Sequence, residues 1–197
     1  MTTRPDGSTP LIVHGQVYLR SPERSDIPLF VEWLGDARTS RTLGIRVPLS
    51  IPMEEAWFEA ISAGQGKDRY AFIACRLADD RPVGSIGLFD TDHVNGTSAL
   101  GLSVGTEADR GQGYGTDMLL ALLGFGFDQL RLEHIWLEVF EYNPGARRLY
   151  ERLGFVHEGT FRRQRFTEGR RWDVYRYSML ADEWRARRTE GDGAAAG

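Results

Sequence analysis

Lysine and cysteine are nearly absent from this sequence of 197 residues, since Lys67 is the only lysine and Cys75 the only cysteine. A Walker phosphate-binding loop ends in Gly-Lys-Ser or Gly-Lys-Thr, and Lys67 stands in neither, so this class of nucleotide-binding protein is excluded. A disulfide within the chain is excluded as well. Cys75 closes the apolar run 70–75, and we expect a small buried side chain there rather than a reactive thiol.

Long apolar runs and an excess of positive charge are also missing. No stretch approaches the roughly 18–20 apolar residues that cross a membrane, and the polar residues 1–10 lack the apolar centre of a signal peptide. We therefore expect a cytoplasmic protein without a membrane partner. The formal net charge of −4 argues against a nucleic-acid-binding protein and mildly favours a cationic or amine substrate.

Clusters that could hold a metal or activate a nucleophile are missing too. The four histidines are scattered along the chain, without the ligand spacing of a metal site or a serine partner for nucleophilic catalysis; they are His14, His93, His134 and His157. We expect no metal.

The most informative segment that is present is a glycine-rich turn of seven residues, Arg110, Gly111, Gln112, Gly113, Tyr114, Gly115 and Thr116. It follows an apolar run of strand length, residues 99–104, and precedes residues 114–130, whose apolar side chains recur at helical spacing. Glycines let a backbone approach a ligand closely, and the N-terminus of a helix favours an anion. The turn predicts a phosphate site, with an ordinary strand-to-helix connection as the alternative.

The spacing of the glycines decides between phosphate motifs. A dinucleotide fingerprint has the pattern G-x-G-x-x-G, and glycines at 111, 113 and 115 miss its third position. A nucleotide-dependent oxidoreductase is kept only as an alternative. The pattern Arg/Gln-x-x-Gly-x-Gly/Ala is met by Arg110, Gly113 and Gly115, and it resembles the acyl-CoA pyrophosphate loop of the GNAT N-acetyltransferases.

The order of the expected elements extends this resemblance to most of the chain. Periodicity and turn residues predict strands at 16–20, 70–77, 83–89, 99–104, 134–140, 155–166 and 172–180. Helices are expected from Ser25 or Asp26 to Gly35, from about Pro52, over 114–130, and between Asn143 and Gly154. The segment 36–50 is expected to be irregular.

The resulting order, β-α-α-β-β-β-α-β-α-β-β, is that of the GNAT fold. We therefore expect an α/β (α+β) protein whose mixed, mostly antiparallel sheet is flanked by helices. A single domain is expected over residues 11–184, with a flexible arm at 1–10 and a disordered tail at 185–197.

Within this family the sequence looks most similar to the RimJ/RimL-type, spermidine-acetyltransferase-like branch. The matching segments are 137–140, Asn143, 148–151, 153–155, 173–175 and 183–184. The resemblance implies that acetyl-CoA is the co-substrate, that the backbone from Arg110 to Thr116 holds its pyrophosphate, and that Asn143 contacts its arm. It also implies that the backbone of Leu102, Ser103 and Val104 pairs with the pantetheine arm. From the residues alone, Asn143 is a helix cap, and the two roles can coexist.

Glu138 is the candidate base. Strand alternation places it on one face with Trp136 and Phe140, where it would be partly desolvated as a general base requires. The alternative is that Glu138 lies in water at the strand end or pairs with an arginine. In protein N-terminal acetyltransferases of this family a Glu and a Tyr twelve residues later act as base and acid, and Glu138 and Tyr150 repeat that spacing.

Tyr150 is accordingly the candidate acid, which would protonate the CoA thiolate. Core packing is its alternative, because Ala146, Leu149, Tyr150 and Leu153 form one apolar helix face. The arginine clusters 162–165 and 170–171 alternate with aromatic residues. Stacking on nucleic acid is one interpretation of them, but we favour a solvated hairpin, or contacts with CoA phosphate or an acidic peptide.

We therefore predict an acetyl-CoA-dependent N-acetyltransferase that acts directly on a primary amine, in a protein N-terminus, a polyamine or a small molecule. RimL-like enzymes often carry an acidic residue where this chain has Ser98, Ala99 and Leu100. A non-catalytic acyl-CoA-binding regulatory module is therefore the alternative. Exposed strand edges near the C-terminus also suggest a homodimer.

Overall fold

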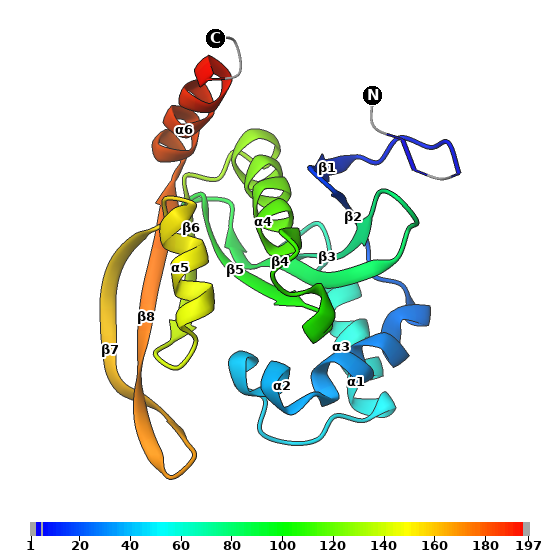
Figure 1. Cartoon of the computed structure of the whole chain (residues 1–197), viewed down its shortest axis with the longest axis vertical. Helices are drawn as coiled ribbons and strands as arrows, with labels where there is room; N and C mark the ends of the chain where they lie inside the picture. Colours follow the sequence, from blue (N-terminus) through cyan, green and yellow to red (C-terminus); the bar gives the residue numbers. More distant parts are fainter. Residues whose placement is uncertain (1–2, 5, 195–197) are drawn as a thin grey trace. The chain divides into compact units, whose positions relative to one another are not determined.

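A computed structural model describes residues 3, 4 and 6–194 (Figure 1). The strands are β1 (Ile12–His14), β2 (Val17–Arg20), β3 (Tyr70–Arg76), β4 (Pro82–Asp92), β5 (Thr97–Val104), β6 (His134–Phe140), β7 (Val156–Thr167) and β8 (Arg170–Leu180). The helices are α1 (Ile27–Gly35), α2 (Ala37–Leu43), α3 (Ile51–Gly64), α4 (Tyr114–Gly124), α5 (Pro144–Arg152) and α6 (Ala181–Ala194). Short 3-10 turns cover Arg24–Asp26 and Glu107–Asp109, and a π-helical segment, Phe125–Gln129, continues α4.

Hydrogen bonds join the strands in the order β1-β2-β3-β4-β5-β6-β8-β7. The β5–β6 pair is parallel, whereas β1–β2, β2–β3, β3–β4, β6–β8 and β7–β8 are antiparallel. The predicted fold class is therefore confirmed: the sheet is mixed, mostly antiparallel and flanked by helices.

The chain forms two compact units. The first unit comprises Met1–Thr91 and Leu100–Leu122, and the second comprises Asp92–Ala99 and Leu123–Gly197. The boundaries fall inside β4, β5 and α4. The first unit therefore contains the glycine-rich turn and the end of the strand that precedes it.

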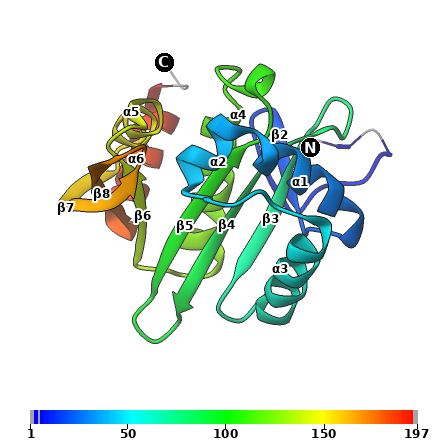
Figure 2. The same cartoon turned by 90° about the horizontal axis from the view of Figure 1, so that it is seen from below.

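In the first unit, α1, α2 and α3 lie over one face of β3, β4 and the end of β5, and α4 lies over the other (Figure 2). The core beneath α1 includes Tyr18, Phe30, Ile73 and Cys75. The Cys75 thiol is free and fully buried, as the sequence predicts. Burial raises the pKa of this thiol and keeps it uncharged.

Two elements of the first unit differ from the sequence prediction. Residues 37–43 form helix α2, although no apolar periodicity marks this segment. Its ends are well defined, because the Asp36 side chain accepts a hydrogen bond from the Thr39 N–H at 2.8 Å, and Gly44 ends the helix with φ +75°. An extra strand, β1, precedes the predicted first strand and pairs with it.

The structure describes parts of both end segments of the chain, residues 3, 4 and 6–10 and residues 185–194. In the N-terminal segment, Arg4 donates a hydrogen bond to Asp80 at 3.3 Å and lies over the ring of Tyr18. After β8, helix α6 continues to Ala194, through most of the segment for which disorder is predicted. The Glu183 carboxylate accepts the Leu180 N–H at 2.8 Å, which supports the start of α6. Residues 1, 2, 5 and 195–197 lie outside the described residues.

In the second unit the predicted elements are confirmed closely. Strand β6 has the predicted bounds, and α5 has Asn143 as its N-cap, with the side-chain oxygen accepting the Ala146 N–H at 3.2 Å. Gly154 follows α5 with φ +83°, a conformation that suits glycine. The Tyr177 hydroxyl of β8 donates to Glu151 of α5 at 2.7 Å and fixes the helix on the β7–β8 hairpin.

Candidate active site

The glycine-rich turn begins α4. The Gly113 carbonyl accepts the Thr116 and Asp117 N–H groups at 3.0 and 3.1 Å, so the helix starts directly after Gly113. Gly111 and Gly113 have φ values of +77° and +90°, which L side chains rarely adopt. The first N–H groups of a helix have no partner within it and point outward from its N-terminus. The predicted position of the turn is thus confirmed.

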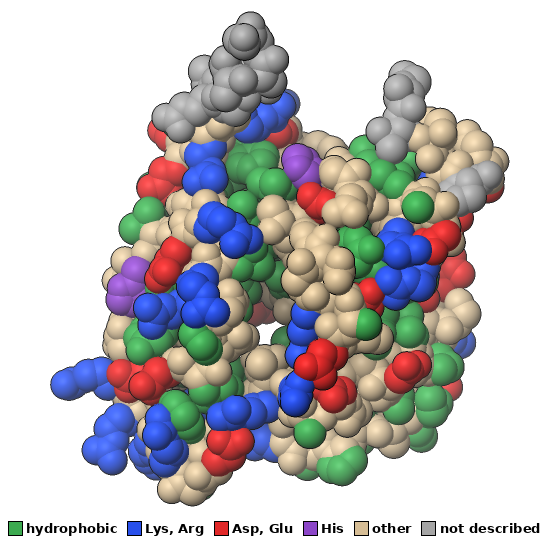
Figure 3. Space-filling model, in the orientation of Figure 1, with side chains coloured by type: hydrophobic (Ala, Val, Ile, Leu, Met, Phe, Trp, Pro, Cys, Tyr) green, Lys and Arg blue, Asp and Glu red, His purple; other side chains and the backbone are tan. Residues whose placement is uncertain are grey.

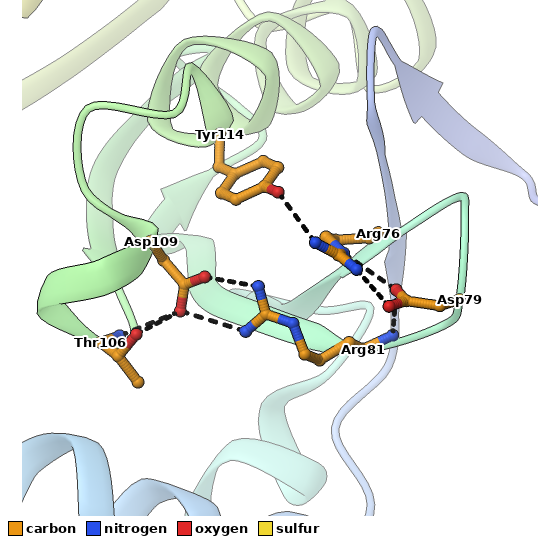
Figure 4. A network of polar contacts seen from close by, with 6 residues as sticks. All are labelled: Arg76, Asp79, Arg81, Thr106, Asp109 and Tyr114. Carbon is orange, nitrogen blue, oxygen red and sulfur yellow. Dashed lines mark hydrogen bonds and ion pairs between the residues drawn. The ribbon is translucent and has the colours of Figure 1, made fainter.

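Hydrogen bonds and ion pairs within the first unit hold the glycine-rich turn in place (Figure 4). Before it, the buried Asp109 carboxylate accepts hydrogen bonds from Arg81 and from the Thr106 hydroxyl, both at 2.6 Å. Within it, the Tyr114 hydroxyl accepts a hydrogen bond from Arg76 at 3.4 Å, and Arg76 also donates to Asp79. Burial alone would raise the pKa of Asp109, but Arg81 and Thr106 outweigh it and lower that pKa, so this carboxylate is charged near neutral pH.

Two side chains of the turn, those of Arg110 and Tyr114, are directed into the protein. Arg110 donates to the Thr39 hydroxyl of α2 at 2.6 Å, and Tyr114 is buried. At Gly111 an added Cβ would meet no atom within 4 Å, so the space beside this residue is open. Open space, positive φ values and a helix N-terminus together fit a diphosphate group.

A pocket of about 390 Å³ lies in the same unit. Gly101, Leu102 and Ser103 of β5 form part of its wall, so the strand segment predicted to hold the pantetheine arm also borders this pocket. Its other walls come from Pro22, α1, the end of α2, the connection between α2 and α3, α3, β3 and β4. The lining side chains there are mainly apolar and include Leu34, Leu43, Ile45, Leu49, Trp57, Phe72 and Phe89.

Glu54 of α3 lies in this wall and is absent from the sequence-predicted site. Its residue is only 5% exposed, and among the described residues its carboxylate has no hydrogen-bond or ion-pair partner. Burial raises its pKa above the usual value. A signal was present in the sequence, because Glu54 lies three and seven residues before Trp57 and Ile61, on the apolar face of the predicted helix.

Glu138 of β6, in the second unit, pairs with an arginine, which is one of the environments that the sequence leaves open. The alternation along β6 is as expected, with Ile135, Leu137 and Val139 buried. Glu138 is nevertheless exposed, and its carboxylate accepts a hydrogen bond from Arg176 at 2.9 Å. The reason is the strand register: Arg176 is the β8 residue opposite Glu138, and its guanidinium also lies 3.9 Å from the centroid of the Trp136 ring. The arginine pair that the sequence leaves open as an alternative is therefore present, with the Glu138 side chain 36% exposed.

Tyr150 of α5 is buried in the second unit and packs edge-on against Phe155. Burial raises its pKa to about 12, so the phenol keeps its proton at neutral pH. Within the described residues its hydroxyl has no hydrogen-bond partner. Of the predicted site residues, the turn and 102–104 lie in the first unit, and Glu138, Asn143 and Tyr150 in the second.

The arginines of the β7–β8 hairpin gather on one surface (Figure 3). Several stack on aromatic rings of their own unit, such as Arg170 on Trp172 at 3.2 Å and Arg165 on Phe140 at 5.1 Å.

Over residues 3, 4 and 6–194, no three His, Cys, Asp or Glu side chains come together as metal ligands. In that same part of the chain, no helix combines the length and apolar character that crossing a membrane requires.

Comparison with known proteins adds independent evidence. The family described as "Acetyltransferase (GNAT) domain" matches residues 16–156. The SPbeta prophage-derived uncharacterized N-acetyltransferase YokL of Bacillus subtilis (strain 168) is 33% identical over 166 residues, which cover 84% of this chain and 90% of the relative. The spermidine N(1)-acetyltransferase of Vibrio cholerae is 30% identical over 174 residues, 87% of this chain and 97% of the relative.

A solved structure leads to the same fold. The crystal structure of spermidine N-acetyltransferase from Vibrio cholerae in complex with CoA and spermine has a TM-score of 0.78 at 23% identity, covering 86% of this chain and 98% of that one. The family match spans more than half of the chain, and both sequence relatives align over nearly their whole length. The chain therefore belongs to the GNAT acetyltransferase family and is an acyltransferase.

Proposed function

We propose that this protein transfers the acetyl group of acetyl-CoA to a primary amine. One observation carries the proposal: the open glycine-rich turn at the N-terminus of α4 shares a unit with the strand segment 102–104 and with the pocket that this segment borders. A site for a diphosphate, a site for an extended arm and a cavity for an acceptor are what acyl transfer from CoA needs.

The transfer is proposed to be direct. Cys75 is fully buried in the core beneath α1, and its raised pKa disfavours the thiolate that a covalent mechanism would use. Tyr150 is proposed as the acid for the departing thiolate, because a phenol with a pKa of about 12 still holds its proton at neutral pH. Glu138 was the predicted base, and its ion pair with Arg176 favours a structural role for it instead.

The RimJ/RimL-type assignment and the acceptor belong to the proposal as well. A spermidine acetyltransferase is among the relatives, which supports an amine acceptor. A protein N-terminus, a polyamine and a small-molecule amine are the three classes to test. A second copy of the chain is the proposed partner, through the outer strand β7.

A thermal-shift titration with acetyl-CoA, CoA and NADH side by side tests the co-substrate. A ligand at 100 times its dissociation constant stabilises a protein by about 2.7 kcal/mol, so binding raises the melting temperature measurably. We expect stabilisation by acetyl-CoA and CoA and none by NADH. Stabilisation by NADH alone would favour the oxidoreductase alternative, and no response to either CoA form would overturn the proposal.

Two glycine variants make the titration specific for the turn. Gly111 and Gly169 both have φ above +70°, and an added Cβ would meet nothing within 4 Å at either position. Gly111→Ala and Gly169→Ala therefore introduce similar backbone strain, but only Gly111 lies in the turn. We expect Gly111→Ala to weaken CoA stabilisation and Gly169→Ala to leave it intact. CoA binding without acetylation of any amine in a broad panel would favour the regulatory module.

A further inference from the structure

Glu54 is an unusual residue for the wall of an apolar pocket. A buried carboxylate normally has a partner, because loss of hydration without a compensating contact costs several kcal/mol. The other two buried carboxylates described in the first unit follow this rule: Asp26 pairs with Arg20 and Asp109 with Arg81. Glu54 has no such partner among the described residues, and the pocket is the space that its side chain borders.

We infer that Glu54 is the group that receives the ammonium of the acceptor, and that this acceptor is a monoamine with an apolar body. The inference rests on the proposed function and names the substrate class of the same site. Among the residues that line the pocket, Glu54 is the only one with an ionisable side chain. An ammonium beside it would provide the missing partner and hold the reactive nitrogen at a fixed point of the wall.

The rest of the wall selects the body of the acceptor. Around Glu54 the lining is formed mainly by aliphatic and aromatic side chains, among them Leu49, Trp57, Phe72 and Phe89. Such a surface favours an aliphatic or aromatic group over water. A polyamine carries several charges, and with one carboxylate in the wall its remaining ammonium groups would lie unpaired against apolar side chains. The pocket therefore discriminates against polyamines.

The position of Glu54 also fits proton transfer. The acceptor arrives as an ammonium, which has no lone pair, so Glu54 first accepts one proton. The freed nitrogen then forms a C–N bond to the acetyl carbon as the C–S bond breaks, and the electron pair of that bond leaves with sulfur. The nitrogen, which now carries two protons, gives up one as the amide forms, and the thiolate takes up one. Glu54 returns its own proton to solvent, so the reaction releases one proton overall.

The surroundings of Glu54 suit that role. Burial raises its pKa above the usual value, which is the direction that a general base at neutral pH requires. The pocket lining holds no second charged side chain that would oppose the rise of the Glu54 pKa. Its other polar side chains, Ser85 and Ser103, are neutral hydroxyls. The start of α3 lies one turn away, because the Ser50 carbonyl accepts the Glu54 N–H at 3.0 Å, and the helix dipole there favours the carboxylate once it has lost its proton.

Calorimetric titration of amine binding, with and without CoA, tests the inference independently of turnover. The probes are 2-phenylethylamine, the uncharged 2-phenylethanol, and spermidine. Glu54→Gln removes the charge and keeps the shape, and Glu55→Gln is the matched control, because Glu55 is its exposed neighbour on the same helix. Melting curves of both variants verify that they fold.

We expect 2-phenylethylamine to bind the wild type more tightly than the alcohol or spermidine does. Glu54→Gln should weaken amine binding at least tenfold, which corresponds to about 1.4 kcal/mol, and Glu55→Gln should not change it. Equal amine binding in Glu54→Gln and the wild type, or spermidine as the tightest ligand, would overturn the inference. Amine binding that depends on Glu54 in a protein that ignores CoA would support the amine site and overturn the acetyltransferase proposal instead.

Discussion

Asp109 and Glu54 are buried carboxylates of the same unit, and their surroundings move their pKa values in opposite directions. Asp109 accepts hydrogen bonds from Arg81 and Thr106, which lower its pKa in spite of burial. The Glu54 carboxylate is buried without a hydrogen bond or ion pair among the described residues, and burial raises its pKa. The first carboxylate stabilises the entry to the glycine-rich turn, whereas the second costs stability at neutral pH. Sites that bind or react often carry such a cost.

The cost at Glu54 predicts a pH-dependent gain in stability for Glu54→Gln. Because the folded-state pKa is raised, the wild type loses stability as pH rises from the unfolded-state pKa, about 4.3, through the folded-state value. The variant has no such loss. We expect Glu54→Gln to be more stable at pH 8 by about 0.5–2 kcal/mol, and the difference to vanish near pH 4. Urea unfolding at both pH values measures it, with Glu55→Gln as control.

If the variant were less stable than the wild type at pH 8, Glu54 would have a stabilising partner in solution. The carboxylate would then not be available to an acceptor. Equal stability of the two proteins at every pH would mean that the burial of Glu54 is not maintained in solution.

Tyr150 provides a second prediction for a single residue. If its phenol protonates the departing thiolate, Tyr150→Phe removes the proton donor and keeps the packing against Phe155. We expect kcat to fall by about 10²–10⁴-fold, the usual contribution of a general acid, with little change in melting temperature. Tyr175→Phe, in β8 of the same unit, should keep its activity. Wild-type kcat in Tyr150→Phe would leave Tyr150 with a packing role alone.

Among whole elements, those with strong local signals were predictable from the sequence. Strand β6 and helix α5 have their expected bounds, because alternation, Asn143 and Gly154 act within a few residues of one another. Helix α2 was missed, since its sequence Ala-Arg-Thr-Ser-Arg-Thr-Leu has no apolar stripe, although the cap Asp36 and the terminating Gly44 were readable signals.

The site was predictable where it depends on backbone and unpredictable where it depends on distant side chains. The glycine-rich turn follows from local sequence. The pairing of Glu138 with Arg176 depends on the register between β6 and β8, which no local pattern fixes. Glu54 was missed because a carboxylate on the buried face of a helix runs against the usual pattern.

The β6–β8 pairing predicts the behaviour of Glu138→Gln. Side chains of both partners are about one-third exposed, with 36% for Glu138 and 32% for Arg176, so the ion pair is partly screened by water. We expect the substitution to change the free energy of unfolding by less than about 1 kcal/mol and to leave kcat near its wild-type value. Steady-state kinetics and urea unfolding measure both. A loss of kcat of about 10²-fold or more would return the role of base to Glu138.

For the whole molecule, the outer strand of the sheet is the feature that bears on assembly. Strand β7 is the last in the hydrogen-bonding order of the described strands, and it pairs on one side only, with β8. Its free edge offers N–H and C=O groups to another strand. The strand also exposes Val156, Phe161 and Phe166, with 50%, 41% and 51% of each residue accessible. Arg162, Arg163 and Arg165 lie between the two phenylalanines, and their like charges oppose pairing of two copies of this strand.

We expect the apolar contacts to prevail, because the arginines of the hairpin are partly engaged: Arg176 lies over Phe161 and Arg171 over Phe166. Light scattering after size exclusion should then give at least twice the 22.2 kDa of one chain. Phe161→Glu adds a buried charge to such a contact and should return the protein to a monomer. Val94→Glu is the control, since Val94 is 95% exposed and lies in the turn between β4 and β5. A wild type that is monomeric at every concentration would mean that the arginines keep this edge free.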